Sequence, residues 1–262
     1  MKFLRKYYDK LSYDRKQSLR YVRCFFWTIN WVKTLWINFK ILPFRQAIKC
    51  PIIVAYNTKI KSVGRILFEG EIYTGMFLLG VMRVRDYESN HQPTIFNNCG
   101  CIHIKGRVRL NSGVALFVNR GANIFLGKLV GIGANSRVVC YREISFGDDV
   151  RISWNNQIFD TDFHFLYNID KNHYYPRTKP VAIGSNVFIG NGCTIGKGTK
   201  IPDGCVVSCI SKVSGDFTAE GENLLIMGNP ASVIKKGINM SSTWFPEKES
   251  EIAKLLEDGQ HS

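Results

Sequence analysis

Several features are scarce in this sequence of 262 residues. Proline occurs eight times against 23 glycines, which suits a fold with many tight turns better than a low-complexity chain. None of the eight cysteines forms a C-x-x-C pair, so we expect free, buried thiols in a reducing compartment and no bound metal. The longest uncharged run near the start ends at Lys33, well short of the roughly 20 apolar residues of a membrane span. With no secretory signal in view, a cytoplasmic location is expected.

Acidic residues are almost missing from the first quarter of the chain. Residues 1–60 contain 13 Lys and Arg but only Asp9 and Asp14, which is +11 of the net charge of +14. A basic segment attached to a nearly neutral body indicates an anionic partner, such as membrane phospholipid, a lipid-linked pyrophosphate or nucleic acid. No recognised nucleic-acid-binding module surrounds the basic residues, so nucleic acid is not expected as a partner.

A repeat of six residues fills the second half of the chain. Its anchor positions are Ile183, Ile189, Ile195, Ile201, Val207 and Val213. A period of six matches neither an α-helix nor an ordinary strand. It predicts a coil with flat sides of short strand, β-branched anchors pointing inward, small residues at the corners, and backbone hydrogen bonds between coils. Less regular hexads occur upstream, and the predicted β-helix spans 55–237.

The repeat is interrupted once. Hexads stop after Ile158 and resume at about Val181, and the loop 159–180 between them is rich in Tyr, His, Asn and Pro. The loop begins with the pattern Asp-x-Asp-x-His, which ends at His164. Loops that leave a rigid scaffold are frequent carriers of chemistry, so the loop is the candidate site.

Three segments together resemble the left-handed β-helix O-acetyltransferases that act on sugars and bacterial surface polysaccharides. They are the hexads at 183–218, the Asp-x-Asp-x-His loop and the closing run Met-Gly-Asn-Pro-Ala at 227–231. The resemblance implies a left-handed parallel β-helix, a homotrimer and acetyl-CoA as the acyl donor. It also implies that His164 is the general base, because an imidazole titrates near neutral pH and can deprotonate the acceptor hydroxyl. Asp160, or else Asp162, would orient that imidazole.

The resemblance further implies two sets of binding residues. For acetyl-CoA they are Asn191, Ser208, Ser211, Ser214, Lys235 and Lys236, with the two lysines meeting the phosphates. For the acceptor they are Trp154, Asn155 and Asp162. The acceptor itself is expected to be a sugar or glycan precursor, either free or linked to a lipid.

The ends of the chain have helical patterns. Residues 12–40 are predicted to be helical, and one apolar stripe comprises Phe25, Ile29, Val32, Trp36 and Phe39. This helix either docks on the β-helix or a neighbouring subunit, or lies on the inner leaflet of an anionic membrane that residues 1–50 contact. Residues 247–257 predict a short amphipathic helix. The expected organisation is a basic N-terminal region (1–54), a catalytic β-helix (55–237) and a helical tail (238–262).

Three other functions fit parts of the pattern. The same fold could transfer an acyl group to the nitrogen of an amino-sugar, and the sequence does not separate this from O-acyl transfer. A γ-type carbonic anhydrase needs three His ligands for each zinc, and the five histidines have no pair at a suitable spacing in the regular repeat. A non-catalytic trimeric scaffold is the third alternative, and the presence of His164 argues against it.

Overall fold

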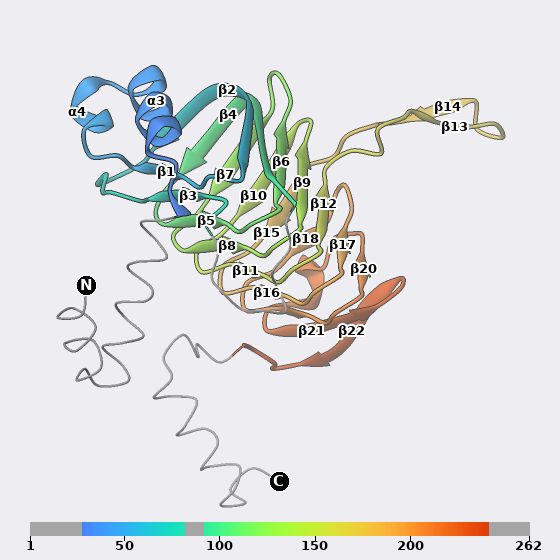
Figure 1. The fold of residues 1–262 in the computed structure, drawn as a ribbon. Coiled ribbons are helices and arrows are strands. Elements are labelled where there is room, and N and C mark those ends of the chain that lie inside the picture. Colours follow the sequence, from blue (N-terminus) through green and yellow to red (C-terminus); the bar gives the residue numbers. More distant parts are fainter. Residues whose placement is uncertain (1–27, 82–91, 241–262) are drawn as a thin grey trace, which may run out of the picture.

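Short strands separated by tight corners make up most of the chain, as the six-residue repeat predicts. The computed structural model describes residues 28–81 and 92–240. These residues wind into a parallel β-helix with three faces, which two short helices, α3 (Trp31–Ile41) and α4 (Phe44–Ala47), cover at one end (Figure 1). The mainly β, parallel β-helix architecture is therefore confirmed. Within the same residues, no helix is both long and apolar enough to cross a bilayer.

The three faces belong to two sheets. The first face contains β1 (Ile52–Val54), β3 (Phe77–Leu79), β5 (Val108–Leu110), β8 (Val130–Ile132), β11 (Arg151–Ile152), β16 (Phe188–Ile189), β19 (Val206–Val207), β21 (Leu224–Gly228) and the antiparallel β22 (Ala231–Lys236). The second sheet bends along two long strands, β2 (Thr58–Phe68) and β4 (Thr94–Ile104), and so supplies both other faces. The second face continues with β6 (Ala115–Val118), β9 (Arg137–Cys140), β12 (Gln157–Phe159), β17 (Thr194–Ile195) and β20 (Lys212–Val213). The third continues with β7 (Asn123–Leu126), β10 (Glu143–Phe146), β15 (Val181–Ile183) and β18 (Lys200–Ile201).

The anchor residues of the repeat form the core. All six anchors from Ile183 to Val213 are at most 3% exposed. They stack from coil to coil in parallel register; on the second face, for example, Ile158 pairs with Ile195 and Ile195 with Val213. Asn135 and Asp149 occupy corners with positive φ angles of 60° and 50°, which short polar side chains tolerate better than most others. The sequence thus predicted correctly which residues face inward.

Helix α3 closes the open edge of the first coil. The Asn38 side chain donates to the carbonyl of Ile52 at 2.7 Å and accepts from the amide of the same residue at 3.1 Å. Thr34 Oγ1 accepts from the amide of Val54 at 3.0 Å. A strand edge would otherwise expose a row of unpaired backbone groups, and here helix side chains satisfy them. Of the predicted N-terminal helix, residues 12–27 lie outside the described residues, as does the predicted helix at 247–257.

Two glycines on one coil test how closely the coils pack. A Cβ atom built on Gly133 would lie 2.3 Å from the backbone oxygen of Ser153 in the next coil, whereas on Gly131 the nearest atom would be a side-chain nitrogen of Arg109 at 3.8 Å. We expect Gly133→Ala to lower the free energy of unfolding by roughly 1–3 kcal/mol, because the backbone must shift to admit the methyl group. The matched change Gly131→Ala should stay within about 0.5 kcal/mol of wild type. Urea unfolding of both variants measures this, and equal losses would contradict the close approach at Gly133.

Candidate active site

The predicted loop forms an arm that leaves the β-helix between its second and third faces. It departs after β12 and returns at β15, and its outer part is an antiparallel hairpin of β13 (Leu166–Asn168) and β14 (His173–Tyr175). Figure 1 shows this hairpin projecting away from the body. At the base of the arm, its two legs are joined by a bridge between Thr161 and Thr178 and by a hydrogen bond from the amide of Asp162 to the carbonyl of Arg177. The arm therefore has a fixed root on a rigid scaffold.

His164 lies at this root, in a tight turn. Its amide donates to the carbonyl of Asp162 at 2.7 Å, and the residue between them, Phe163, has a φ angle of 65°. A hydrogen bond over two residues with positive φ at the centre is a γ-turn of the rare, strained kind, and a bulky residue at its centre adds to the strain. The His164 side chain is exposed. Strained backbone of this kind clusters at functional sites, where the surrounding structure holds it in place.

An aromatic cluster holds the turn against the body. The Phe163 ring lies 5.5 Å from the ring of Phe159 and 6.0 Å from that of Tyr141, measured between centroids and with both pairs edge to face. The Arg177 guanidinium lies over the rings of Tyr141 and Phe165, at 5.6 and 5.1 Å from their centroids. Edge-to-face pairs and cation–π contacts are both attractive. The Phe163 ring, at the centre of the strained turn, therefore contacts the body on one side although it is 43% exposed, and the neighbouring His164 is exposed as well.

Asp160 has a different role from the one expected. Its carboxylate is fully buried and accepts hydrogen bonds from the amides of Tyr141, Arg142 and Glu143 at 2.6–2.8 Å. These amides form the corner of the preceding coil. Nothing in the described part of the chain links this carboxylate to His164, so the orienting role proposed for Asp160 is replaced by that of a clamp between coils.

The charge of Asp160 also affects a neighbouring thiol. Cys140 Sγ lies 3.5 Å from Asp160 Oδ2 and is buried. Burial raises the pKa of the Cys140 thiol far above its ordinary value, and the nearby carboxylate raises this pKa further. Cys140 therefore stays protonated at neutral pH. Cys193 and Cys205 are buried as well, as expected, whereas Cys99 and Cys209 are exposed, contrary to the expectation of buried thiols.

Asp162 faces a partner that the sequence did not suggest. Its carboxylate forms an ion pair with Lys197, and Lys197 Nζ also donates to the carbonyl of Pro176 at 2.6 Å. Lys197 therefore ties both legs of the arm to the next coil. Its position in a regular hexad resembled that of any other corner lysine, so no sequence signal pointed to this contact.

The remaining predicted residues fall into separate places. Trp154, Asn155, Asn191 and Ser208 stack at the corner between the first and second faces, where the amide of Gly192 donates to the carbonyl of Trp154. Ser214 lies at the corner that carries the arm.

Ser211 is buried, and its hydroxyl bonds to the carbonyl of Ser208 and the amide of Gly228, so it cannot reach a cofactor without breaking these bonds. Lys235 and Lys236 lie on β22, and Lys236 pairs with Glu220 at 3.1 Å. Within one chain, His164 and Trp154 therefore lie at opposite edges of the second face.

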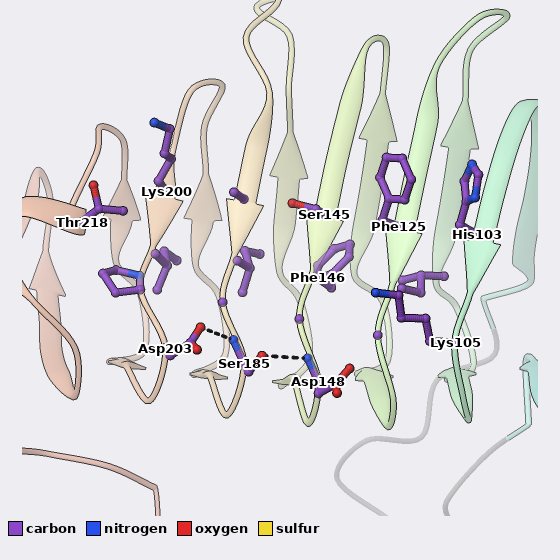
Figure 2. A pocket seen from close by; sticks show the side chains of 18 of the residues that line it. His103, Lys105, Phe125, Ser145, Phe146, Asp148, Ser185, Lys200, Asp203 and Thr218 are labelled. Atoms are coloured by element: carbon purple, nitrogen blue, oxygen red, sulfur yellow. Dashed lines mark hydrogen bonds between the residues drawn. The ribbon is translucent and has the colours of Figure 1, made fainter. Parts of the chain in front are cut away.

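A groove of about 630 Å³ crosses the third face (Figure 2). His103 and Phe125 lie on adjacent coils with their rings stacked at 4.5 Å, and His103 Nδ1 lies 3.5 Å from Glu69. Figure 2 shows Asp203, Ser185 and Asp148 in a row along its lower rim, joined by hydrogen bonds between neighbouring coils. Sequence analysis did not single out this groove, because its residues are the outward-facing positions of separate strands.

Known proteins resemble this chain, although no family model matches it. An uncharacterized 24.8 kDa protein in the cps region of Klebsiella pneumoniae is 34% identical over 203 residues, which cover 78% of this chain and 87% of that protein. The galactoside O-acetyltransferase of Escherichia coli strain K12 is 29% identical over 122 residues, 46% of this chain and 58% of the relative. A lipopolysaccharide biosynthesis O-acetyl transferase of the same strain is 26% identical over 162 residues, 58% and 80% of the two chains. The crystal structure of a polySia-specific acetyltransferase matches the fold with a TM-score of 0.50 at 23% identity, covering 62% of this chain and 76% of that one.

The two aspartates of the arm should respond differently to substitution. We expect Asp160→Asn to lower the free energy of unfolding by roughly 2–4 kcal/mol, because an amide NH₂ cannot accept the backbone N–H groups that the carboxylate binds. Asp162→Asn removes one ion pair whose side chains are 18% and 30% exposed, keeps an amide that can still accept from Lys197, and should cost less, about 1 kcal/mol. Urea denaturation compares the two variants. An Asp160→Asn protein as stable as wild type, but with a shifted pH–rate profile, would restore the orienting role of Asp160.

Proposed function

The chain belongs to the hexapeptide-repeat acyltransferase family, and we propose that it transfers acetyl from acetyl-CoA to a hydroxyl of a sugar or surface-polysaccharide precursor. The acceptor class is supported by relatives whose names refer to a galactoside and to lipopolysaccharide biosynthesis. The observation that carries the proposal is the place of His164. It is an accessible imidazole on a strained turn at the root of the arm that interrupts the repeat.

His164 acts as the general base in this reaction. Its neutral imidazole takes the proton of the acceptor hydroxyl as the oxygen attacks the thioester carbonyl of acetyl-CoA. The resulting oxyanion is stabilised by a backbone N–H group of a coil corner. When the intermediate collapses, the carbon–sulfur bond breaks, the imidazolium returns its proton to the leaving thiolate, and the products are an acetyl ester and free coenzyme A. Asp162, held by Lys197, keeps the backbone before His164 in position.

A homotrimer completes the site in this proposal. Within one chain, Trp154, Asn155, Asn191 and Ser208 lie at a different corner from His164. A threefold assembly can place that corner of one subunit against the arm of the next, where the acceptor and coenzyme A would bind with Ser214, Lys235 and Lys236. The arm also has apolar side chains that a neighbour would cover, since Ile169 is 83% exposed and Phe165 and Tyr174 are each 64% exposed.

The proposed location follows from the acceptor. A lipid-linked acceptor would meet a cytoplasmic, acetyl-CoA-dependent enzyme at the inner face of the cell membrane. The enzyme is therefore proposed to work in the cytoplasm next to that face.

Release of free coenzyme A from acetyl-CoA, measured with a panel of mono- and oligosaccharides, tests the proposed function. We expect acceptor-dependent release by the wild type and a loss of roughly 10²–10⁴-fold in His164→Ala, the usual contribution of a general base. His173→Ala is the matched variant, because His173 lies on the same arm at β14 and is the rival candidate for the base; we expect this variant to keep its activity.

Three outcomes would count against the proposal. Equal turnover by His164→Ala and wild type would remove His164 from the chemistry. Failure of the wild type to bind acetyl-CoA would favour a non-catalytic scaffold, and preference for an amino-sugar nitrogen would change the acceptor atom. Thermal unfolding of each variant checks that a lost activity does not reflect a lost fold.

A further inference from the structure

The outward face of the two N-terminal helices exposes a continuous set of large apolar side chains. On α3 these are Val32, Leu35, Trp36 and Phe39, and Phe44 and Ile48 continue the set at α4, with exposed fractions from 45% to 81%. The α3 residues recur at helical spacing and form one stripe. We call these six residues the α3 face. Scattered surface hydrophobes are ordinary, but a contiguous apolar patch marks an interaction surface.

The helix cannot turn to bury this stripe. Its opposite side is committed to the β-helix, where Thr34, Ile37 and Asn38 are fully buried. The polar groups of Thr34 and Asn38 satisfy the edge of β1, and Ile37 packs in the main core. Rotating α3 would expose unpaired backbone groups as well as the core, at a cost of several hydrogen bonds. Each folded chain therefore presents the α3 face outward.

The sequence segment that carries the α3 face is basic. From Arg15 to Phe68 the sequence has no Asp or Glu. Exposed cations next to the face are Lys40, Arg45, Lys49, Lys59 and Lys61. An excess of positive charge in one surface segment attracts anionic surfaces.

Trp36 connects the apolar stripe to these cations. The Lys40 ammonium lies over the Trp36 ring, 4.7 Å from its centroid. Trp36 also lines a hollow of about 400 Å³ together with Lys59 and Lys61 of β2. Trp and Lys together are suited to the headgroup layer of a bilayer, where the ring lies at the acyl boundary and the ammonium reaches phosphate.

We propose that the α3 face binds the surface of an anionic phospholipid bilayer. Val32, Trp36 and Phe39 insert at the acyl boundary, and the neighbouring lysines and arginine contact lipid phosphates. The residues of the face are separate from the arm that carries His164. Binding to membrane and acetyl transfer can therefore succeed or fail independently.

Vesicle co-sedimentation of the full-length protein tests the proposal. The vesicles are phosphatidylcholine alone and phosphatidylcholine mixed with phosphatidylglycerol. We expect the wild type to bind the mixed vesicles, to bind the neutral ones weakly, and to dissociate as salt is raised. Trp36→Ser/Phe39→Ser should weaken binding by roughly tenfold or more, because two aromatic anchors are removed. Lys40→Gln/Arg45→Gln should mainly reduce the dependence on the anionic lipid.

Controls make each outcome decisive. Ile210→Ser/Ile234→Ser removes two exposed apolar side chains at the other end of the β-helix, and should bind vesicles like the wild type. Transfer to a soluble sugar should be unchanged in Trp36→Ser/Phe39→Ser, which also shows that this variant folds. Vesicle binding by that variant equal to wild type, or no binding by the wild type, would overturn the proposal. A change in its oligomeric mass by ultracentrifugation would overturn it in favour of a contact between copies of the chain.

Discussion

The requirement that the backbone groups of each coil pair with the next coil governs this structure. Parallel strands cannot satisfy their own N–H and C=O groups, so each coil depends on a neighbour at both sides. Inside the stack, the corners of neighbouring coils must therefore approach closely, and the missing side chain of Gly133 allows one such approach to the backbone of Ser153. At the two ends it demands a cover. Thr34 and Asn38 of α3 supply it at the first coil, and the antiparallel strand β22 supplies it at the last.

The same pairing between coils allows the chain to leave the β-helix for the arm without disturbing the strand order around it. Although the arm removes about 20 residues from the path, β12 still pairs with β17, and β15 still pairs with β10. Asp160 contributes to this continuity by binding three amides of the previous corner just before the chain departs. A strained turn at Phe163 can then be held by aromatic packing rather than by the repeat. Regular coils supply rigidity, and the arm presents exposed side chains, among them that of His164, on this rigid support.

Much of the fold could be predicted because the repeat encodes it locally. The step from Ile183 to Val213 identifies inward positions, and the interruption after Ile158 identifies the arm. Upstream, β2 and β4 are long strands that bend across a corner, and their anchors do not keep the step. Contacts such as that of the Asp160 carboxylate with the Tyr141 amide cannot be predicted from the sequence, because a backbone amide has the same chemistry at every residue. The predicted apolar stripe does not lie on one helix face. Helix α3 begins only at Trp31, after its N-cap at Asn30, so Ile29 precedes the helix and is buried, whereas Val32 and Phe39 are exposed.

The order of the coils also fixes the distance between the arm and the first coil. Strands of the first face follow one another from β1 to β11, so the coil that bears the arm is the fifth from the end that α3 covers. Neighbouring strands are separated by about 4.8 Å, which puts the arm roughly 20 Å above the first coil. For a glycan growing on a bilayer at the α3 face, the stack would act as a ruler. Under the two proposals made above, the acceptor hydroxyl would have to lie about that far from the first coil to reach His164.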